Sequence, residues 1–365
     1  MHKRLESIKK WLTNERTDVA FITSTENVFY LSGFHSDPHE RLLGLAIFPE
    51  EEPFLICPDM EKQDAKNAGW PYDIIGYSDI DDPWELVAKH ILKRVNKVHT
   101  LAIEKEHLNV ERYEELQRRF ANIRFTSIEE KLRNLRLVKD EREIAYLKKA
   151  CELADYAVEV GVNEIKEGKT ELDIIGAIEY ELKKKGILEM SFSTMVLTGE
   201  NAASPHGTPG QTKIKKGDFI LFDLGVVYNG YCSDITRTVA YGDCHAKQEE
   251  IYQTVFHAEQ KALQLVEPGR KAKDLDIAAR KIINAAGYGD YFPHRLGHGL
   301  GISVHEYPSI TETNELLLQD GMVFTIEPGI YVPQVAGVRI EDDILVTEHG
   351  VEVLTKFPKE LQIIS

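Results

Sequence analysis

The feature that most restricts the fold is an apolar segment that carries two aspartates. Residues 219–240 read FILFDLGVVYNGYCSDITRTVA, with Asn229 and Gly230 between two apolar stretches. Asn-Gly is the preferred pair of a two-residue type I′ turn, so the segment predicts a β-hairpin. Asp223 and Asp234 then lie inside strands whose other residues are suited to burial, and their presence there needs an explanation.

The register of this hairpin decides where the two carboxylates point. Pairing of Tyr228 with Tyr231 places Gly225 opposite Asp234, and Asp223 then projects from the same face as Gly225. The two aspartates become diagonal neighbours, roughly 7 Å apart at the backbone, and can reach a common point. Burying both charges would cost several kcal/mol unless cations neutralise them, so the pair favours a metal site. For either aspartate alone, a turn cap or a place at a sheet edge is the alternative.

Two glutamates repeat the anomaly closer to the C-terminus. Glu327 ends the strand predicted from MVFTIEPG, and Glu341 lies in the interior of the strand predicted from GVRIEDDILV. Arg339 shares a face with Glu341, so a guanidinium is also expected at the site. Taken singly, Glu327 could be an exposed charge at a strand end, and Arg339 with Glu341 a surface ion pair.

Histidines lie around a glycine-rich string between these two regions. His298 is at the centre of HRLGHGLGISVHE, with His294 before it and His305 after it. Glycines let the backbone approach a ligand closely, and imidazole is a common nitrogen ligand of first-row metals. The string lacks the spacing of a dinucleotide fingerprint. His206, in SPHG, is a further candidate, and for each histidine alone a structural role is the alternative.

Length and hydrophobic pattern predict two domains. A chain of 365 residues exceeds what one hydrophobic core usually supports. Predicted strands alternate with helical patterns in the first part of the chain, at 19–23, 43–48, 54–57 and 101–104. This alternation indicates an α/β domain over residues 1–128. The densely charged segment 127–143 is interpreted as a helical connector that leads into a second domain, residues 129–365.

The second domain contains a repeated order of predicted elements. Apolar spacing predicts a helix over 144–158 and another that starts after a cap at Thr170 and stops at Gly186. A second pair is predicted over 251–266 and 274–287. Each pair has a Leu-Asp-Ile string in its second helix and is followed by strands, which predicts a duplicated half-domain.

Composition excludes several classes of partner and location. The chain has 60 acidic and 44 basic residues, a net charge of −16, which opposes binding to nucleic acid or to an anionic membrane. Residues 1–16 have the pattern of an amphipathic helix that packs on the protein, and not of a signal peptide. The four cysteines form no CxxC pair and indicate reduced thiols in a cytoplasmic protein: Cys57, Cys151, Cys232 and Cys244.

Five of these side chains resemble, in identity and order, the metal ligands of the pita-bread metallopeptidase family: Asp223, Asp234, His298, Glu327 and Glu341. That family includes methionine aminopeptidase, aminopeptidase P and prolidase. The strings FDLG, SDITRT, GHGLG, EPG and RIEDD extend the likeness over nearly all of residues 140–365. The separate N-terminal domain, with its string NVFYLSGF, resembles the creatinase and prolidase branch. The resemblance implies an α+β catalytic domain of two duplicated half-domains.

The resemblance also implies a dinuclear metal centre. Asp223 would chelate one ion and His298 with Glu327 the other, while Asp234 and Glu341 would bridge both. Four carboxylates carry about −4, which balances two divalent cations and leaves room for a bridging hydroxide that attacks the scissile carbonyl. Oxygen-rich ligation with one imidazole suits Mn²⁺, with Co²⁺ or Zn²⁺ as alternatives. Glu327 would carry the proton to the leaving nitrogen.

Further side chains receive roles from the same resemblance. His206, His305 and Arg339 would bind substrate or stabilise the intermediate, and His294 and Tyr331 would also lie in the active site. The loop SDPHER, which contains His39, is interpreted as a mobile segment that closes over the site, from the same or a partner subunit. Together with Arg295 or Arg339 it would select dipeptides by pairing with their carboxylate. An ordinary solvated loop is the alternative.

The expected function is therefore hydrolysis of the peptide bond that precedes proline. A cytoplasmic, homodimeric Xaa-Pro dipeptidase (prolidase) acting on proline-containing dipeptides is favoured. The first alternative is an Xaa-Pro aminopeptidase (aminopeptidase P), which would act on longer peptides. A pita-bread protein that binds without hydrolysis is a second alternative. An unrelated dinuclear phosphoesterase ranks last, because the candidate ligands are mainly carboxylates and no basic phosphate clamp accompanies them.

Overall fold

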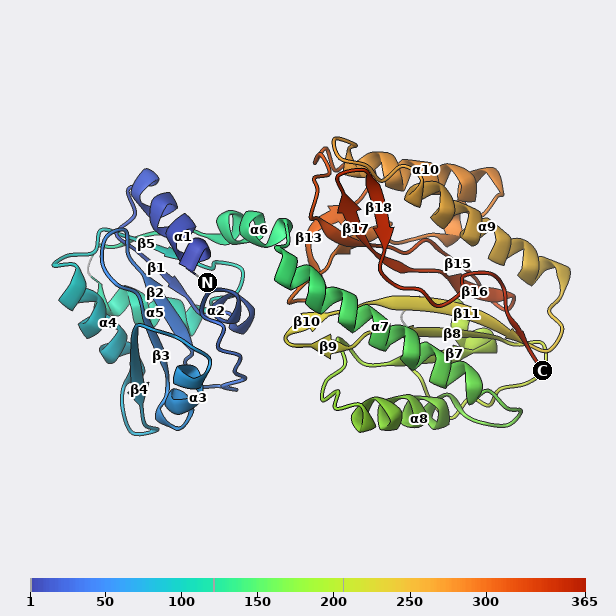
Figure 1. The fold of residues 1–365 in the computed structure, drawn as a ribbon, viewed down its shortest axis with the longest axis horizontal. Coiled ribbons are helices and arrows are strands. Elements are labelled where there is room, and N and C mark those ends of the chain that lie inside the picture. Colours follow the sequence, from blue (N-terminus) through green and yellow to red (C-terminus); the bar gives the residue numbers. More distant parts are fainter. Residues whose placement is uncertain (1, 121, 206) are drawn as a thin grey trace. The chain divides into compact units, whose positions relative to one another are not determined.

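The structure of the protein is a computed structural model, which describes residues 2–120, 122–205 and 207–365 (Figure 1). The chain divides into two compact units, one ending at Arg136 and the other running from Leu137 to Ser365. Buried apolar side chains form a core within the N-terminal unit and two large clusters within the C-terminal unit.

The N-terminal unit is built on a six-stranded sheet in the order β4-β3-β2-β1-β5-β6. Its strands are β1 (Val19–Ile22), β2 (Gly44–Ile47), β3 (Phe54–Pro58), β4 (Asp73–Tyr77), β5 (Thr100–Ile103) and β6 (Arg124–Ser127). Its helices are α1 (His2–Asn14), α2 (Thr25–Ser32), η1 (Asp59–Glu61), α3 (Lys62–Asn67), α4 (Pro83–Arg94) and α5 (Val110–Arg119), followed by α6 (Glu129–Leu137) at the end of the unit. The α/β architecture, the amphipathic N-terminal helix and the predicted strands are confirmed. The sequence did not predict β4 and β6, because these two edge strands are largely half-exposed or exposed and lack an apolar run.

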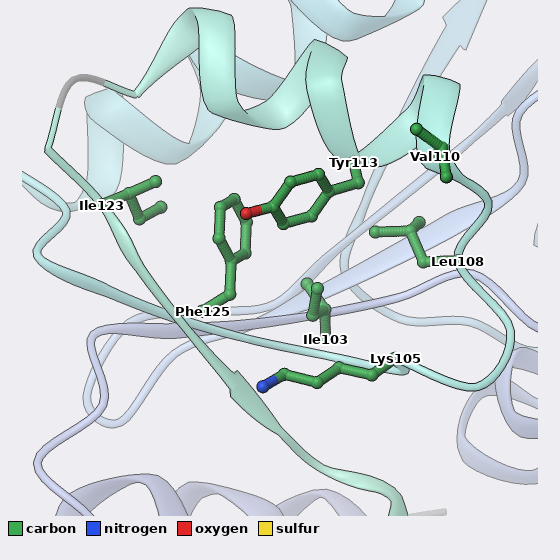
Figure 2. Close-up of a pocket in the computed structure, with 7 residues that line it drawn as sticks. All are labelled: Ile103, Lys105, Leu108, Val110, Tyr113, Ile123 and Phe125. Carbon is green, nitrogen blue, oxygen red and sulfur yellow. The ribbon is translucent and has the colours of Figure 1, made fainter.

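A pocket of about 470 Å³ opens in this unit beside β6 and the start of α5 (Figure 2). Its lining is mainly apolar, with Ile103, Leu108 and Phe125, and includes the side chains of Lys105 and Tyr113. The Tyr113 and Phe125 rings lie against each other, with centroids 4.6 Å apart. None of the side chains that line this pocket belongs to the predicted active site.

The C-terminal unit repeats one arrangement of helices and strands. Its helices are α7 (Glu141–Asn163), α8 (Glu171–Lys184), η2 (Gly199–Ala203), α9 (Ala246–Leu263), α10 (Ala272–Ala285) and η3 (Gly289–Tyr291). The strands of the first half are β7 (Met195–Thr198), β8 (Phe219–Leu224), β9 (Val227–Tyr228), β10 (Tyr231–Cys232) and β11 (Ile235–Tyr241). The strands of the second half are β12 (Gly297–Gly299), β13 (Glu306–Ile310), β14 (Val323–Ile326), β15 (Gly329–Val332), β16 (Ala336–Arg339), β17 (Asp342–Thr347) and β18 (Gly350–Val353), and β19 (Ile363–Ile364) ends the chain.

The helix boundaries follow local chemistry that the sequence shows. Thr170 caps α8 by accepting a hydrogen bond from the Asp173 N–H (3.1 Å), as predicted. Gly186 follows that helix with a φ of 82°, which favours glycine. The third predicted helix begins earlier than expected, because His245 caps α9 through the Gln248 N–H. A helix pair thus precedes the strands of each half, and the predicted repetition is confirmed.

Alternation along the strands separates an apolar face from a polar one. Phe222 and Leu224 of β8 pack in the core that α7 and α8 form, so Asp223 between them projects from the opposite face. Phe324 and Ile326 of β14 pack likewise in the core with α9 and α10. The helices therefore cover one face of each half (Figure 1). By alternation along the strands, the anomalous carboxylates project from the other face.

Candidate metal centre

The hairpin predicted from residues 219–240 forms with the predicted register. Tyr231 pairs with Tyr228 in the short β9–β10 ladder, and Thr236 pairs with Asp223 in the β8–β11 ladder. Both ladders have the same register, so Asp223 and Asp234 are diagonal neighbours on one face, as expected.

The strands are interrupted where this register places Gly225 opposite Asp234. A Cβ atom at Gly225 would lie 1.8 Å from the carbonyl oxygen of Ser233, so only glycine fits there. Asp234 lies between β10 and β11, and its backbone N–H is bound by the Asp343 carboxylate (2.8 Å). The interruption leaves Asp234 buried, with 4% of the residue exposed.

The second hairpin has an equivalent interruption. Ile326 pairs with Asp342 in the β14–β17 ladder, and Gly329 pairs with Arg339 in the β15–β16 ladder, in one continuous register. The expectation that Glu341 lies in the interior of one strand is wrong, because the strand breaks between β16 and β17. At the break the Glu341 N–H donates to the carbonyl oxygen of Thr236 (3.0 Å) in the first hairpin. This bond joins the two halves at the site.

Three of the predicted ligands form a tight group in this structure. Asp234, His298 and Glu341 each offer a ligand atom, and these atoms lie within 4.8 Å of one another. His298 Nε2 is 3.7 Å from Asp234 Oδ2 and 3.3 Å from Glu327 Oε1. Groups from β11, β12, β14 and β17 or their ends therefore converge on one point.

The protonation state of His298 shows why a cation fits there. Its Nδ1 is 3.2 Å from the carbonyl oxygen of Gly299, which calls for a proton on Nδ1. Burial lowers the pKa of His298 to about 3, so the ring is neutral and Nε2 carries a lone pair. That lone pair faces the carboxylates of Asp234 and Glu327. A bound cation would turn these repulsive contacts into ligand bonds.

The buried carboxylates are unfavourable in their ionised form in the metal-free site. Burial raises the pKa of Asp234 and of Glu341 well above their ordinary values, and each is raised further by nearby carboxylates. Burial also raises the pKa of Glu327 to about 7. Asp234 Oδ1 and Glu341 Oε1 are buried without a hydrogen-bond partner among the described residues. Two orphaned oxygens beside a neutral imidazole are the donor set that a divalent cation takes.

Asp223 is held slightly apart from this group by an arginine. Its Oδ2 contacts Arg339 Nη2 in an ion pair. Arg339 Nη1 donates to the Tyr331 hydroxyl (2.7 Å), which lies 3.0 Å from His294 Nε2. Arg339 is buried, so its interpretation as part of a surface ion pair does not apply.

The remaining predicted residues have different surroundings. The His305 ring meets that of His298 edge to face, with centroids 4.2 Å apart. Arg295 is half-buried, and its Nη1 donates to Ser309 (3.3 Å). His39 belongs to the N-terminal unit, where it is exposed with a φ of 55°. His206 lies outside the described residues.

Two supporting residues were missed by the sequence reasoning. The Thr236 hydroxyl donates to Glu341 Oε2 (2.6 Å) and accepts from Arg339 Nε (3.0 Å). Asp343 binds the backbone of Asp234 and is completely buried. Both project from the same strand faces as the ligands, so extending the two-residue alternation by one step would have found them.

The raised pKa of Glu327 predicts a pH dependence of the metal-free protein. Between its ordinary value of about 4.5 and about 7, Glu327 holds a proton in the folded state that it releases in the unfolded state. Stability must therefore fall as pH rises through this window, by on the order of 3 kcal/mol for this group. Between pH 5 and pH 8, metal-free Glu327→Gln should therefore lose less unfolding free energy than the metal-free wild type. Thermal unfolding of both proteins at the two pH values measures this difference. An equal loss in both proteins would contradict the assignment.

Comparisons with known proteins agree with this geometry. Residues 145–348 match the profile of Metallopeptidase family M24, and residues 4–138 match the Creatinase/Prolidase N-terminal domain. A Bacillus subtilis (strain 168) protein provisionally named dipeptidase YkvY is 56% identical over 361 residues, covering 99% of each chain. Among the helices of the described residues, none combines the length and apolar composition that crossing a membrane requires.

Solved structures show the same architecture. The prolidase from Pyrococcus horikoshii OT3 is 38% identical, with a TM-score of 0.91 over 98% of this chain and 99% of the other. The X-Pro aminopeptidase from Thermotoga maritima MSB8 is 32% identical, with a TM-score of 0.87 over 96% of this chain and 98% of the other. The predicted α/β N-terminal domain and pita-bread catalytic fold are confirmed.

Proposed function

The chain belongs to metallopeptidase family M24, and on that basis we propose that it is an Xaa-Pro dipeptidase, which cleaves the bond before proline in dipeptides. The observation that carries the proposal is the buried group of Asp234, His298 and Glu341, with two carboxylate oxygens that have no partner among the described residues. Relatives named as a dipeptidase and a prolidase support this reading. The similarity to the T. maritima X-Pro aminopeptidase supports the alternative, an Xaa-Pro aminopeptidase.

We further propose that the site holds two divalent cations, with Mn²⁺ favoured and Co²⁺ or Zn²⁺ as alternatives. The side chains that would hold them are Asp223, Asp234, His298, Glu327 and Glu341. When bound, the ions would supply Lewis-acid activation of water and of the scissile carbonyl. Two divalent cations would balance the negative charge of four carboxylates. Their binding would explain why four carboxylates can be buried together.

The protein's own side chains would manage the proton and the substrate. Glu327 would carry the proton, because its carboxylate lies at the site, 3.3 Å from His298 Nε2. This suits proton delivery to the imide nitrogen of proline, which leaves poorly unless protonated. His305, whose pKa is lowered mainly by burial, lies beside His298 and would donate to the developing oxyanion. His206 would position the substrate near the proline ring.

Selection of dipeptides would depend on a cation that pairs with the substrate carboxylate. Arg339 already contacts Asp223 and Tyr331, with His294 at the end of this chain, so its role would be to hold that wall of the site. Arg295 makes one hydrogen bond to a serine and is the better candidate for the carboxylate. His39 and its loop would close the site. We also propose a cytoplasmic homodimer, and the unbridged thiols of Cys57, Cys151 and Cys244 agree with a reducing compartment.

Rates on Leu-Pro, Leu-Ala and Leu-Pro-Pro-Gly test these proposals together. We expect Mn²⁺-dependent cleavage of Leu-Pro, little cleavage of Leu-Ala and loss of activity with a chelator. Faster cleavage of the longer peptide would identify an aminopeptidase instead. Absence of both metal binding and hydrolysis would leave the binding-protein alternative.

A further inference from the structure

Glu171 is a buried carboxylate that the metal centre does not use. It is the first residue of α8, is 0% exposed, and pairs with no cationic side chain in the described part of the chain. Its oxygens accept hydrogen bonds from the backbone N–H groups of Thr198 (2.8 Å) and Gly210 (2.7 Å). The side-chain amide of Asn201 is 3.1 Å from each oxygen. These hydrogen bonds offset the loss of hydration that a buried charge suffers.

The donors come from the two ends of one segment. Thr198 ends β7, and Gly210 follows later in the same connection to β8. Asn201 also reaches across the segment to the carbonyl oxygen of Thr208 (3.4 Å). The Glu171 side chain therefore closes residues 198–210 into a loop, described here except for residue 206.

The closed loop packs against the ribbon that carries active-site groups. A Cβ atom at Gly337 of β16 would lie 1.6 Å from the carbonyl oxygen of Ala202 in η2, so this approach requires glycine. Arg339 lies two residues further along β16, and its guanidinium donates to Tyr331 of β15. The shape of the loop is thus coupled by direct packing to the wall formed by Arg339 and Tyr331.

We propose that Glu171 is a positioning residue for substrate binding. It holds Thr198, Asn201 and Gly210 together, with Ala202 against the β15–β16 ribbon, and so affects affinity for the peptide and not for the metal ions. His206 belongs to this loop by sequence. The expected change in KM rests on the proposed function. Whether Glu171 holds the loop can be tested without any substrate.

The test compares Glu171→Gln with Asp173→Asn. Glutamine keeps the shape of Glu171 but turns an amide NH₂ toward N–H donors. Asp173 is exposed in the same helical turn and caps α8 through the Thr170 N–H (2.9 Å), with no hydrogen bond to the described residues of the loop, so it controls for helix stability. We expect amide hydrogen exchange over residues 198–210 to be about tenfold faster in Glu171→Gln alone. KM for Leu-Pro should rise about tenfold, with kcat within about twofold and bound Mn²⁺ unchanged.

Equal rates of amide hydrogen exchange over residues 198–210 in both variants and the wild type would overturn the proposal. A fall in kcat with KM unchanged in Glu171→Gln would also overturn it. If Glu171→Gln does not fold, Asn201→Ala supplies the answer, because it removes one donor and should shift exchange and KM in the same direction by a smaller factor. If the wild type does not cleave Leu-Pro, the proposed function fails, and the exchange comparison alone decides whether Glu171 closes the loop.

Discussion

Replacing Asp234 by asparagine is expected to abolish peptidase activity and at the same time to stabilise the metal-free protein. Activity should fall at least about a thousandfold, which corresponds to on the order of 4 kcal/mol of transition-state stabilisation. In the metal-free protein at pH 8, however, burial and the nearby Glu341 and Asp223 raise the pKa of Asp234, so folding must either bury its charge or protonate it, and asparagine avoids both costs. Unfolding free energy should therefore increase by on the order of 1–2 kcal/mol.

The two opposite effects separate a metal ligand from a structural aspartate. Asp243→Asn is a matched control, because Asp243 is exposed just after β11 and should change neither quantity. Thermal unfolding with and without Mn²⁺, together with Leu-Pro hydrolysis, measures both. If Asp234→Asn destabilised the metal-free protein and left the stabilisation by Mn²⁺ intact, Asp234 would be a structural residue and not a ligand.

Removal of the Lys359 amine is expected to cause the largest loss of stability. Its Nζ is 2.9 Å from Glu259 Oε1 and also contacts Asp342, and both carboxylates are 0% exposed. Burial raises the pKa of Glu259 to about 8 even with this neighbour present. Lys359→Met would remove a cation from Asp342, whose pKa Arg237 and Lys359 hold below its ordinary value despite burial, at a cost of about 3–5 kcal/mol. Denaturant unfolding of the metal-free protein measures the loss.

Two further variants show whether the ion pair itself is responsible. Lys356→Met removes an exposed amine from the same segment and should change stability by less than about 0.5 kcal/mol. Adding Glu259→Gln to Lys359→Met should recover part of the loss, because it removes the buried carboxyl group whose pKa burial and Asp342 raise. Equal effects of the two lysine substitutions would show that the buried pair contributes nothing measurable.

The positions of the first two aspartates could be predicted because a local turn sets a long register. Asn229 and Gly230 define the hairpin, and from there alternation alone places Asp223 and Asp234 on one face. Helix caps such as Thr170 are equally local. The order of ligands could then be compared with a family pattern, which implied that His298, Glu327 and Glu341 join the two aspartates at one site.

Features that depend on contacts between distant segments could not be predicted. The strand break at Glu341 arises because its N–H bonds to Thr236 of the other hairpin. The role of Asp343 depends on the backbone of Asp234, and that of Glu171 on a loop that follows α8. Hydrophobic periodicity reports which face of a strand is buried, but it does not report which polar groups meet on the buried face.

The central claim is that buried carboxylates from two hairpins and one imidazole are stable together because divalent cations lie among them. Anomalous diffraction at the manganese absorption edge, from crystals grown with Mn²⁺, tests it directly. We predict two peaks within ligand distance of Asp234, Glu341 and His298 Nε2, with Asp223 and Glu327 each contacting one of them. Well-ordered side chains at these positions with no anomalous peak between them would contradict the claim.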